Sequence, residues 1–439
     1  MKRLNGLIAL VLIVSLGYAQ DNTVKKDCES DITDFRGKMI PWEKGAVETG
    51  QYRNVFLEAG FSQEAIDAKL AKAYTDLFEG TSRIYFEVGD SMGYVSDLKN
   101  HDCRTEGLSY GLMVAVQLDK KEVFDRLWRW TRAYMQHQGG IRDGYFAWSV
   151  DPKTGKQFSK GSASDGELYF VTALLFASNR WGNESGIDYY DEARRILNAM
   201  WSKGGTDKMT HVINTEHKLI TFVPDSSGYN WTDPSYHVPA FMEVWANYAN
   251  DGHEEFYSAC ADSSRTYLHR AIHPKTGLTP DYSHFDGSPL LRWGKMGDAF
   301  RYDSWRVPMN IAMDYSWFAK DKTWQQHYAQ LIQNFLYCEG IDTFNDQFNI
   351  DGSTPEWILP AGKNPSVQRL RHSIGLKSTA ASASIMGTQA KSWVFVDELW
   401  NAELKPYDDG YFDPYYDGLL YLFSLMHLSG NYRLITPGM

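Results

Sequence analysis

The chain has 439 residues, and its 55 acidic against 44 basic side chains give a formal net charge of −11 at pH 7. No basic run interrupts the sequence, so nucleic acid and other polyanions are excluded as expected partners. Tyr and Trp are abundant, with 27 and 15 copies, which favours either a large aromatic core or a groove that stacks on rings.

The first twenty residues have the pattern of a cleaved export signal. Lys2 and Arg3 form a positive start, and the apolar run Leu7–Leu16 follows them. Small residues at Gly17 and Ala19 fit a cleavage site. We therefore expect residues 1–20 to be a signal peptide and the mature protein to be periplasmic or secreted, with a retained N-terminal anchor as the alternative. No later segment has the ~18 consecutive apolar residues of a membrane span, so none is expected after the signal is removed.

Apolar residues recur at three- and four-residue spacing along the rest of the chain, which predicts helices. In chain order the predicted helices span residues 65–78, 106–118, 121–136, 165–176, 187–201, 236–248, 254–272, 306–318, 322–337, 376–386, 394–404 and 417–428. About twelve helices would form six pairs, so we expect one all-α domain over residues 30–437, closed into a helical barrel. A helical repeat array is the competing architecture, but no fixed-period self-similarity supports it.

Long loops separate some of these helices. Residues 139–164 and 280–302 are rich in Gly, Pro, Asp and aromatics. Loops of this length in a compact domain are usually functional, so we expect them to form a substrate groove. Alternation of apolar and polar residues within 217–223 predicts a small strand.

The four cysteines, Cys28, Cys103, Cys260 and Cys338, lie far apart in the sequence. None belongs to a CxxC pair or stands near a pair of histidines, so a zinc site is not expected. One or two disulfides and buried free thiols are equally compatible with this spacing.

One carboxylate opens an otherwise apolar helix. The segment Arg104–Gly111 reads RTEGLSYG, and no other carboxylate occurs between Glu106 and Leu118. An apolar surrounding raises the pKa of a carboxyl group, which suits a general acid. The alternative is structural, because a Glu in the first turn also stabilises the helix dipole.

Two further segments place a carboxylate at a predicted helix start. Ser162–Glu167 reads SASDGE, and Asp165 there has the position of a helix N-cap. Phe300–Arg306 reads FRYDSWR, and Asp303 could equally cap the helix that begins near Arg306. An acid among Tyr, Trp and two Arg side chains is also the setting expected of an ionised base that grips a sugar.

These three segments occur in order and resemble glycoside hydrolase family 8, whose members are inverting cellulases, chitosanases, lichenases and xylanases with an (α/α)6 barrel. The resemblance covers most of the mature chain, from about Lys38 to Leu434. It implies that Glu106 is the general acid and Asp303 the general base. It also implies that Asp165 holds the sugar at the cleavage point in a distorted ring. Inversion needs one protonated and one ionised carboxyl group, with room for a water between base and sugar.

Further segments resemble the xylan-active members of the family. Thr232–Phe241 reads TDPSYHVPAF, and the resemblance implies that Tyr236 hydrogen-bonds the attacking water. Gly144–Trp148 reads GYFAW, and Trp148 resembles a stacking platform in a sugar subsite, although a core aromatic is the alternative for both residues. Arg306 lies three residues after Asp303 on one helical face, so it can hold the base or a sugar hydroxyl. Tyr416 completes the predicted substrate-binding set.

The segment Arg371–Leu376, which reads RHSIGL, bears on exo or endo action. It resembles the reducing-end xylose-releasing exo-oligoxylanases, in which a Leu-His-Pro loop closes the groove and the His contacts the reducing sugar. This chain keeps His372 but has Arg371 and Ser373 at the Leu and Pro positions, and a longer insertion, Ile358–Leu370, precedes them. We expect release of xylose from the reducing end of β-1,4-linked xylo-oligosaccharides, with an endo-β-1,4-xylanase as the alternative.

Three other functions fit the sequence less well. A cellulase or chitosanase would share the three carboxylates, and a non-catalytic glycan-binding barrel would be expected to have lost one of them. A helical polysaccharide lyase acts on polyanions, which the charge of −11 disfavours. No cofactor and no metal is implied, since the two carboxyl groups suffice for the reaction. The expected partner is the xylo-oligosaccharide substrate, and the protein is expected to be monomeric.

Overall fold

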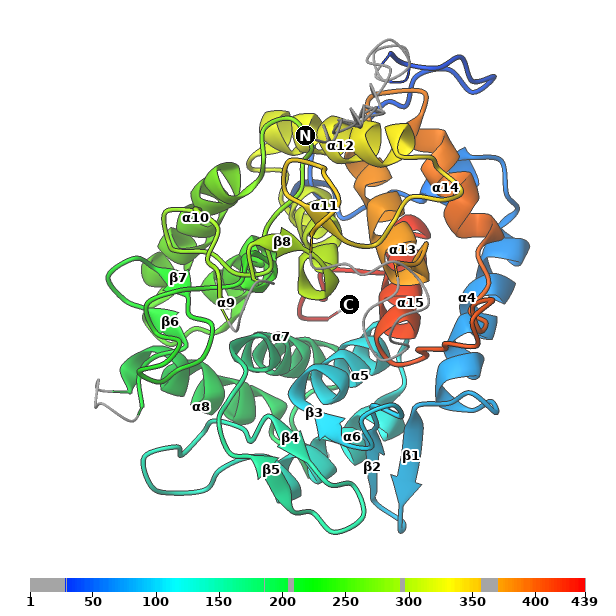
Figure 1. Ribbon diagram of the computed structural model, residues 1–439. Coiled ribbons are helices and arrows are strands. Elements are labelled where there is room, and N and C mark those ends of the chain that lie inside the picture. Colours follow the sequence, from blue (N-terminus) through cyan, green and yellow to red (C-terminus); the bar gives the residue numbers. More distant parts are fainter. Residues whose placement is uncertain are drawn as a thin grey trace, which may run out of the picture.

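Twelve long helices alternate between an inner and an outer ring in the part of the chain that the structure, a computed structural model, describes (Figure 1). The described residues are 28, 30–184, 186–203, 209–292, 297–356 and 370–438. The inner helices are α5 (Thr105–Gln117), α7 (Ser164–Trp181), α9 (Pro239–Tyr248), α11 (Val307–Trp317), α13 (Ile374–Ser382) and α15 (Tyr416–Leu428). The outer helices are α4 (Gln63–Phe78), α6 (Lys121–Tyr134), α8 (Tyr189–Ser202), α10 (Glu254–Ala271), α12 (Lys322–Cys338) and α14 (Ser392–Asn401). This arrangement confirms the predicted all-α (α/α)6 barrel.

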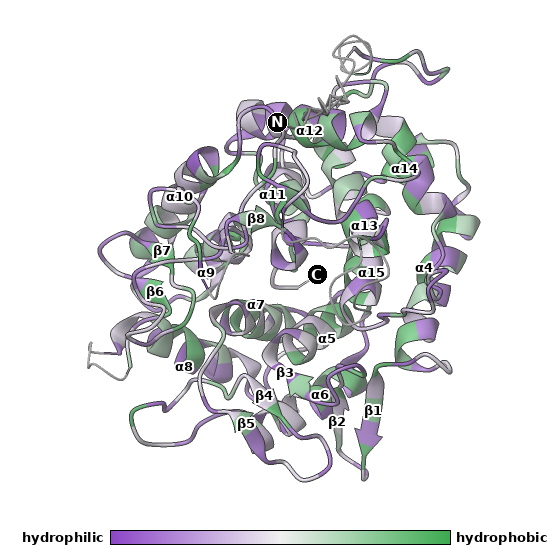
Figure 2. Cartoon of the chain, in the orientation of Figure 1, coloured by the Kyte–Doolittle hydropathy of each residue, from purple (hydrophilic) through white to green (hydrophobic). Residues whose placement is uncertain are grey.

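The two rings differ in the way their sequences meet the core. Inner helices are buried on nearly every side, and in α5 every residue except Glu106 is buried. Outer helices bury one stripe and expose charged residues on the other face, as α6 does with its buried Phe124, Leu127 and Trp128 (Figure 2). A helix that is apolar all round must be enclosed, whereas an amphipathic helix covers a core. The hydropathy of each helix therefore places it in its ring.

The ring closes between the two ends of the helical series. The last inner helix, α15, packs against both α13 and the first outer helix, α4. It also meets α5, because the rings of Tyr110 and Phe423 lie edge to face with centroids 5.3 Å apart. The six inner helices thus surround a common axis, with their loops gathered at the ends of the barrel (Figure 1).

Short antiparallel strands and short helices occupy the connections between the long helices. The strands are β1 (Tyr85–Val88) with β2 (Met92–Val95), β3 (Cys103–Arg104) with β4 (Ser149–Val150) and β5 (Gln157–Ser159), β6 (Ile213–Asn214) with β7 (Leu219–Ile220), and β8 (Ala299–Phe300) with β9 (Phe348–Asn349). The short helices are α2 (Ala46–Thr49), α3 (Val55–Glu58) and the 3-10 helices η1 (Pro234–Tyr236), η2 (Tyr302–Arg306) and η3 (Ala383–Met386). The strand predicted within 217–223 is present, shortened to Leu219–Ile220. Because β3 runs directly into α5 and pairs with β4, the loop before β4 lies beside the start of α5.

A disulfide joins Cys28 to Cys338, 310 residues further along the chain, while Cys103 and Cys260 are buried free thiols. The bond ties the first described residue to the end of α12. Within the described ranges, no helix combines the length and the apolar character that crossing a membrane requires. The predicted signal peptide, residues 1–20, lies outside the described residues.

Candidate active site

Arg306 joins two of the three predicted carboxylates. Its Nη1 donates to Asp165 Oδ2 at 2.6 Å, and its Nη2 lies 3.1 Å from Asp303 Oδ1. The guanidinium also donates to Tyr110 Oη at 2.6 Å and to Ser235 Oγ at 2.8 Å. Arg306 is only 2% exposed, so its charge is balanced inside the protein rather than by solvent. One buried cation therefore fixes the positions of Asp165 and Asp303 relative to each other.

Glu106 is the third carboxylate, in the first turn of α5. Trp148 Nε1 lies 3.0 Å from both of its carboxylate oxygens, and Thr105 Oγ1 donates to Oε2 at 3.2 Å. Burial, and then the negative charge of Asp165, raise the pKa of Glu106 to about 7, against the opposing effects of Trp148 and Arg104. A carboxyl group with this pKa can still carry a proton near neutral pH.

A glycine follows both Glu106 and Asp165, and each glycine permits a close approach at this end of the barrel. A Cβ at Gly107 would come within 2.4 Å of the Tyr415 ring. A Cβ at Gly166 would come within 2.6 Å of Thr105 Cβ, on the neighbouring helix. Gly166 therefore lets the first turns of α5 and α7 come together, and Gly107 lets Tyr415, at the start of α15, approach α5.

The capping alternatives for Asp165 and Asp303 are wrong. Ala163 occupies the N-cap position of α7, and Asp165 lies inside the first turn, where it accepts the N–H of Gly166. Asp303 lies within η2, and the residue at the N-cap of α11 is Arg306. Burial raises the pKa of Asp165, while its ion pair with Arg306 acts in the opposite direction. Both carboxylates are thus committed to the site and not to a helix end.

The backbone immediately before Asp303 is strained. Tyr302 has a φ of 31°, which is rare for a residue with a side chain. Tyr416 Oη donates to the carbonyl oxygen of Tyr302 at 2.8 Å and holds the turn in place. The Asp303 side chain is 35% exposed, so a water molecule can reach it.

Tyr236 lies among the carboxylates and is almost fully buried. Its ring lies 5.5 Å from the Arg306 guanidinium and parallel to Phe222, with ring centroids 5.8 Å apart. Burial, followed by the charges of Asp165 and other nearby carboxylates, raises the pKa of the phenol well above its usual value. Tyr236 therefore keeps its proton and can donate a hydrogen bond.

The sequence reasoning missed two buried carboxyl groups of this site. Asp233 caps η1 by accepting the N–H of Ser235 at 2.7 Å, and Asp281 accepts from Ser304 Oγ at 3.1 Å. Burial raises the pKa of both carboxyl groups well above the usual range, and the charge of Asp303 adds to this effect. Asp233 lies in the TDPSY segment, whose resemblance to the xylan-active members was a signal that could have found it, whereas Asp281 stands in a long loop without any distinguishing pattern. Among the described residues, no group of three or more His, Cys, Asp or Glu side chains is arranged to hold a metal ion.

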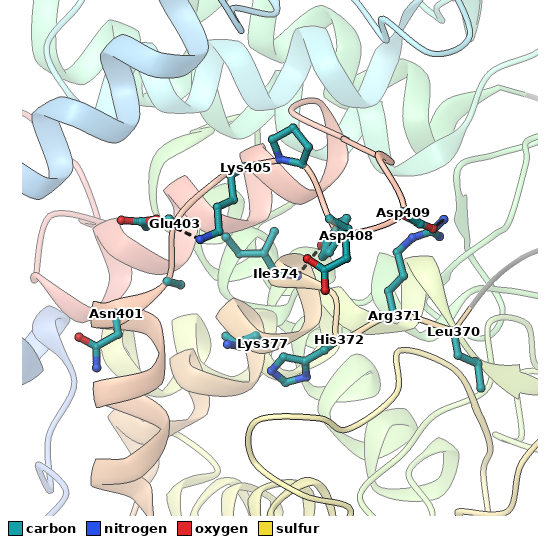
Figure 3. Close-up of a pocket in the computed structure, with 13 residues that line it drawn as sticks. Leu370, Arg371, His372, Ile374, Lys377, Asn401, Glu403, Lys405, Asp408 and Asp409 are labelled. Carbon is teal, nitrogen blue, oxygen red and sulfur yellow. Dashed lines mark hydrogen bonds and ion pairs between the residues drawn. The ribbon is translucent and has the colours of Figure 1, made fainter.

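His372 stands apart from this group of carboxylates. Its Nδ1 lies 3.0 Å from the Phe344 carbonyl oxygen, and its ring packs edge to face on the Phe344 ring. It lines a surface pocket together with Lys377 and Arg371, and Figure 3 shows His372 and Arg371 leaving the chain in different directions. None of the described contacts of His372 is with Glu106, Asp165 or Asp303.

Arg371 and Ser373, which flank His372, line a second and smaller pocket on the side of the base. This pocket also includes Tyr302, Trp305 and Tyr416. His372 is not among the residues that line this second pocket. Residues 358–369 of the predicted insertion lie outside the described residues. The participation of His372 in substrate binding stays a prediction.

The described fold and its carboxylate group define a glycoside hydrolase, and the chain belongs to glycosyl hydrolases family 8, whose model matches residues 91–424. The chain is 40% identical to the reducing-end xylose-releasing exo-oligoxylanase Rex8A of Paenibacillus barcinonensis, over 89% of this chain and 98% of that one. It is 38% identical to the reducing-end xylose-releasing exo-oligoxylanase of Halalkalibacterium halodurans, over 90% and 97% of the two chains. A solved structure of Rex8A from Paenibacillus barcinonensis complexed with xylose superposes with a TM-score of 0.81 at 39% identity, covering 90% of this chain and all of that one.

Proposed function

We propose that this protein hydrolyses β-1,4-linked xylo-oligosaccharides with inversion and releases one xylose from the reducing end. The observation that carries the proposal is the set of Glu106, Asp165 and Asp303, in which the first carboxyl group has a pKa of about 7 and the other two are paired with Arg306. The relatives that are similar over nearly their whole length support the choice of substrate class.

In the proposed reaction Glu106 gives its proton to the glycosidic oxygen, and the bond between that oxygen and the anomeric carbon breaks. Asp303 takes a proton from the water that attacks the opposite face of the sugar. Tyr236 donates a hydrogen bond to this water, and Asp165 holds a hydroxyl of the distorted sugar ring. Arg306, whose Nη2 lies 3.1 Å from Asp303 Oδ1, holds this carboxyl group in position.

Product analysis tests the direction of cleavage. Xylotriose labelled at its reducing end should give labelled xylose and unlabelled xylobiose, and xylotriitol should be a poor substrate. A site built to bind the reducing-end hydroxyl rejects an analogue that lacks it, because its own polar groups are left unpaired. A ladder of mid-length oligomers from xylan, with reduced ends tolerated, would establish the endo-xylanase instead.

The stereochemistry of the first product tests the inverting assignment. Because the base acts on water and not on the sugar, the reducing end that is newly formed when a β-linkage is cleaved should first appear as the α-anomer. Proton NMR during the first minutes of reaction would detect it. A β-anomer formed first would indicate a covalent intermediate and would exclude the Glu106 and Asp303 inverting pair.

We also propose that the protein is exported and acts as a monomer. The Cys28–Cys338 bond supports export, because structural disulfides persist mainly in oxidising compartments. Cell fractionation and N-terminal sequencing of the mature protein test the signal peptide, and light scattering on the purified protein tests the monomer. A mature chain that still begins at Met1, or that fractionates with the cytoplasm, would contradict export.

A further inference from the structure

The only polar atom of the Trp148 side chain points at Glu106. Nε1 lies 3.0 Å from Oε1 and 3.0 Å from Oε2 of Glu106. An indole N–H is a donor only, so Glu106 accepts this hydrogen bond in either arrangement. The sequence predicts Trp148 as a surface on which a sugar stacks, but that role gives the indole nitrogen no task.

The backbone of Trp148 is fixed on both sides. Its carbonyl oxygen accepts the N–H of Thr105 at 3.0 Å, and its own N–H donates to the Gly161 carbonyl oxygen at 2.8 Å. The strand pairing continues directly beyond it, with Arg104 opposite Ser149. The backbone of Trp148 is therefore held directly beside the first turn of α5, which carries Glu106.

Arg104 covers one face of the indole. Its guanidinium lies 4.9 Å from the Trp148 ring centroid, and its Nε is 3.1 Å from Asp102 Oδ2. Asp102 is buried and also accepts a hydrogen bond from Ser149 Oγ, so it connects Arg104 to the residue that follows Trp148 in the chain. A cation on an aromatic face occupies the place where a sugar ring would stack, and it leaves at most the other face for substrate.

We infer that Trp148 is a positioning residue for the general acid, whose indole N–H orients the Glu106 carboxyl group and stabilises the carboxylate that remains after proton transfer. The inference rests on the proposed function of Glu106. In that step the Glu106 proton moves to the glycosidic oxygen, which also takes the electron pair of the broken bond. Asp303 receives the proton of the attacking water, and Trp148 keeps its own proton throughout.

The hydrogen bond grows stronger as the reaction proceeds. A donor interacts about twice as strongly with a charged acceptor as with a neutral one. The Trp148 bond therefore stabilises the transition state, in which Glu106 is becoming a carboxylate, more than the ground state. Its effect on the pKa of Glu106 is to lower it, opposite to the effects of burial and of Asp165.

Trp148→Phe tests this role, because it keeps an aromatic ring and removes only the donor. On xylotriose, kcat should fall roughly 10-fold or more while KM changes little, since a hydrogen bond to a charged group is lost. On β-xylobiosyl fluoride, whose leaving group needs little protonation, kcat should fall less than about twofold. The basic limb of the kcat/KM profile on xylotriose should move to higher pH, because the carboxylate of Glu106 has lost a stabilising donor.

Two other variants accompany this one. Trp181→Phe makes the same chemical change at the far end of α7, about 24 Å from Asp165 by helix rise, where the indole donates to Asp119 at 2.7 Å. It should leave both substrates and the pH profile unaffected. Arg104→Met, which uncovers the indole but keeps its N–H, should show the same leaving-group dependence with a smaller loss of kcat. This second variant keeps the test valid if Trp148→Phe fails to fold.

A stacking platform predicts a different result. If Trp148→Phe raises KM equally for xylotriose and the fluoride, with kcat and the pH limb in place, the inference is overturned. Glu106→Gln is measured in parallel to separate the two proposals. If Glu106→Gln hydrolyses xylotriose at the wild-type rate, the proposed general acid is wrong. If Glu106→Gln loses that activity and Trp148→Phe shows no leaving-group dependence, only the role of Trp148 is wrong.

Discussion

The acid side and the base side of this site are built differently. Glu106 lies half-buried in the first turn of a regular helix, where neutral donors from Trp148 and Thr105 hold it. Asp303 lies in a 3-10 helix, its side chain is 35% exposed, and the guanidinium of Arg306 holds it. The same chemical group thus has a raised pKa of about 7 at Glu106, whereas at Asp303 it lies 3.1 Å from a guanidinium. Environment, and not residue type, assigns the two roles.

The two sides also differ in how their backbone is held. α5 is enclosed on all sides, so packing fixes the helix that carries Glu106. The turn at Tyr302 has an unfavourable φ and depends on the hydrogen bond from Tyr416. Strain of this kind persists only where the surroundings impose it. The base side should therefore be the more sensitive of the two to small changes at a distance.

The largest expected effect comes from removing each carboxylate in turn. Glu106→Gln and Asp303→Asn should each lower kcat on xylotriose by about 10²- to 10⁴-fold, the range that general acid–base catalysis contributes. On β-xylobiosyl fluoride only Asp303→Asn should remain strongly impaired, because water must still be activated. Steady-state kinetics on both substrates would show the contrast, and equal losses on the fluoride would contradict the division of roles.

Removing the cation that serves the base side should affect stability as well as rate. Arg306→Met leaves Asp165 buried without its partner, and breaking a buried ion pair in this way costs about 3–5 kcal/mol. We expect a lower midpoint in urea unfolding followed by circular dichroism. Arg126→Met is a matched control, since Arg126 pairs with the exposed Glu122 and should change the midpoint little. A midpoint for Arg306→Met within error of the wild type would show that the ion pair is dispensable.

The pH dependence should report the acid side. Activity on xylotriose should fall about tenfold per pH unit above pH 7, because Glu106, with its pKa raised to about 7, loses the proton that it must donate. The raised pKa places this limb higher than an ordinary Glu would. On β-xylobiosyl fluoride the limb should be absent. A limb of equal steepness on both substrates would assign it to a different group.

The smallest expected effect concerns the strained turn. Tyr416→Phe removes the donor to the Tyr302 carbonyl, and a neutral hydrogen bond contributes about 1 kcal/mol, which corresponds to about fivefold in rate. We expect kcat to fall by this factor on both substrates, with KM unchanged. A rise in KM at constant kcat would instead support the predicted contact between Tyr416 and substrate.

The long helices could be predicted because apolar residues recur at three- and four-residue spacing in the helices of both rings. The predicted segment 254–272 differs from α10 by a single residue at its end, and 121–136 extends two residues beyond α6. The capping alternatives failed because Asp in the first turn and Asp at the N-cap look alike in sequence. Pairing of Cys28 with Cys338 could not be predicted, since it depends on which ends of the barrel meet.

Three carboxylates of the site were predictable from the sequence, whereas Asp233, Asp281 and the side chains that hold the carboxylates were less so. Glu106, Asp165, Asp303 and Arg306 stand in short motifs with distinctive neighbours, and the structure brings them together. Trp148 and Tyr416 were predicted to bind substrate, and that role stays a prediction, while the structure shows both donating to protein atoms. An aromatic side chain with one donor serves a sugar or a carboxylate equally well, and only its position in space distinguishes the two.

Closure of the ring by α4 and α15 determines when this site can first exist. All three carboxylates have been synthesised once residue 303 is in place, but the helix that contacts α4 and supplies Tyr416 comes more than a hundred residues later, at Tyr416–Leu428. A growing chain therefore holds the chemistry of the site before it holds its geometry. Chains that stop before α15 should be inert toward glycans, so the last inner helix determines when hydrolysis begins.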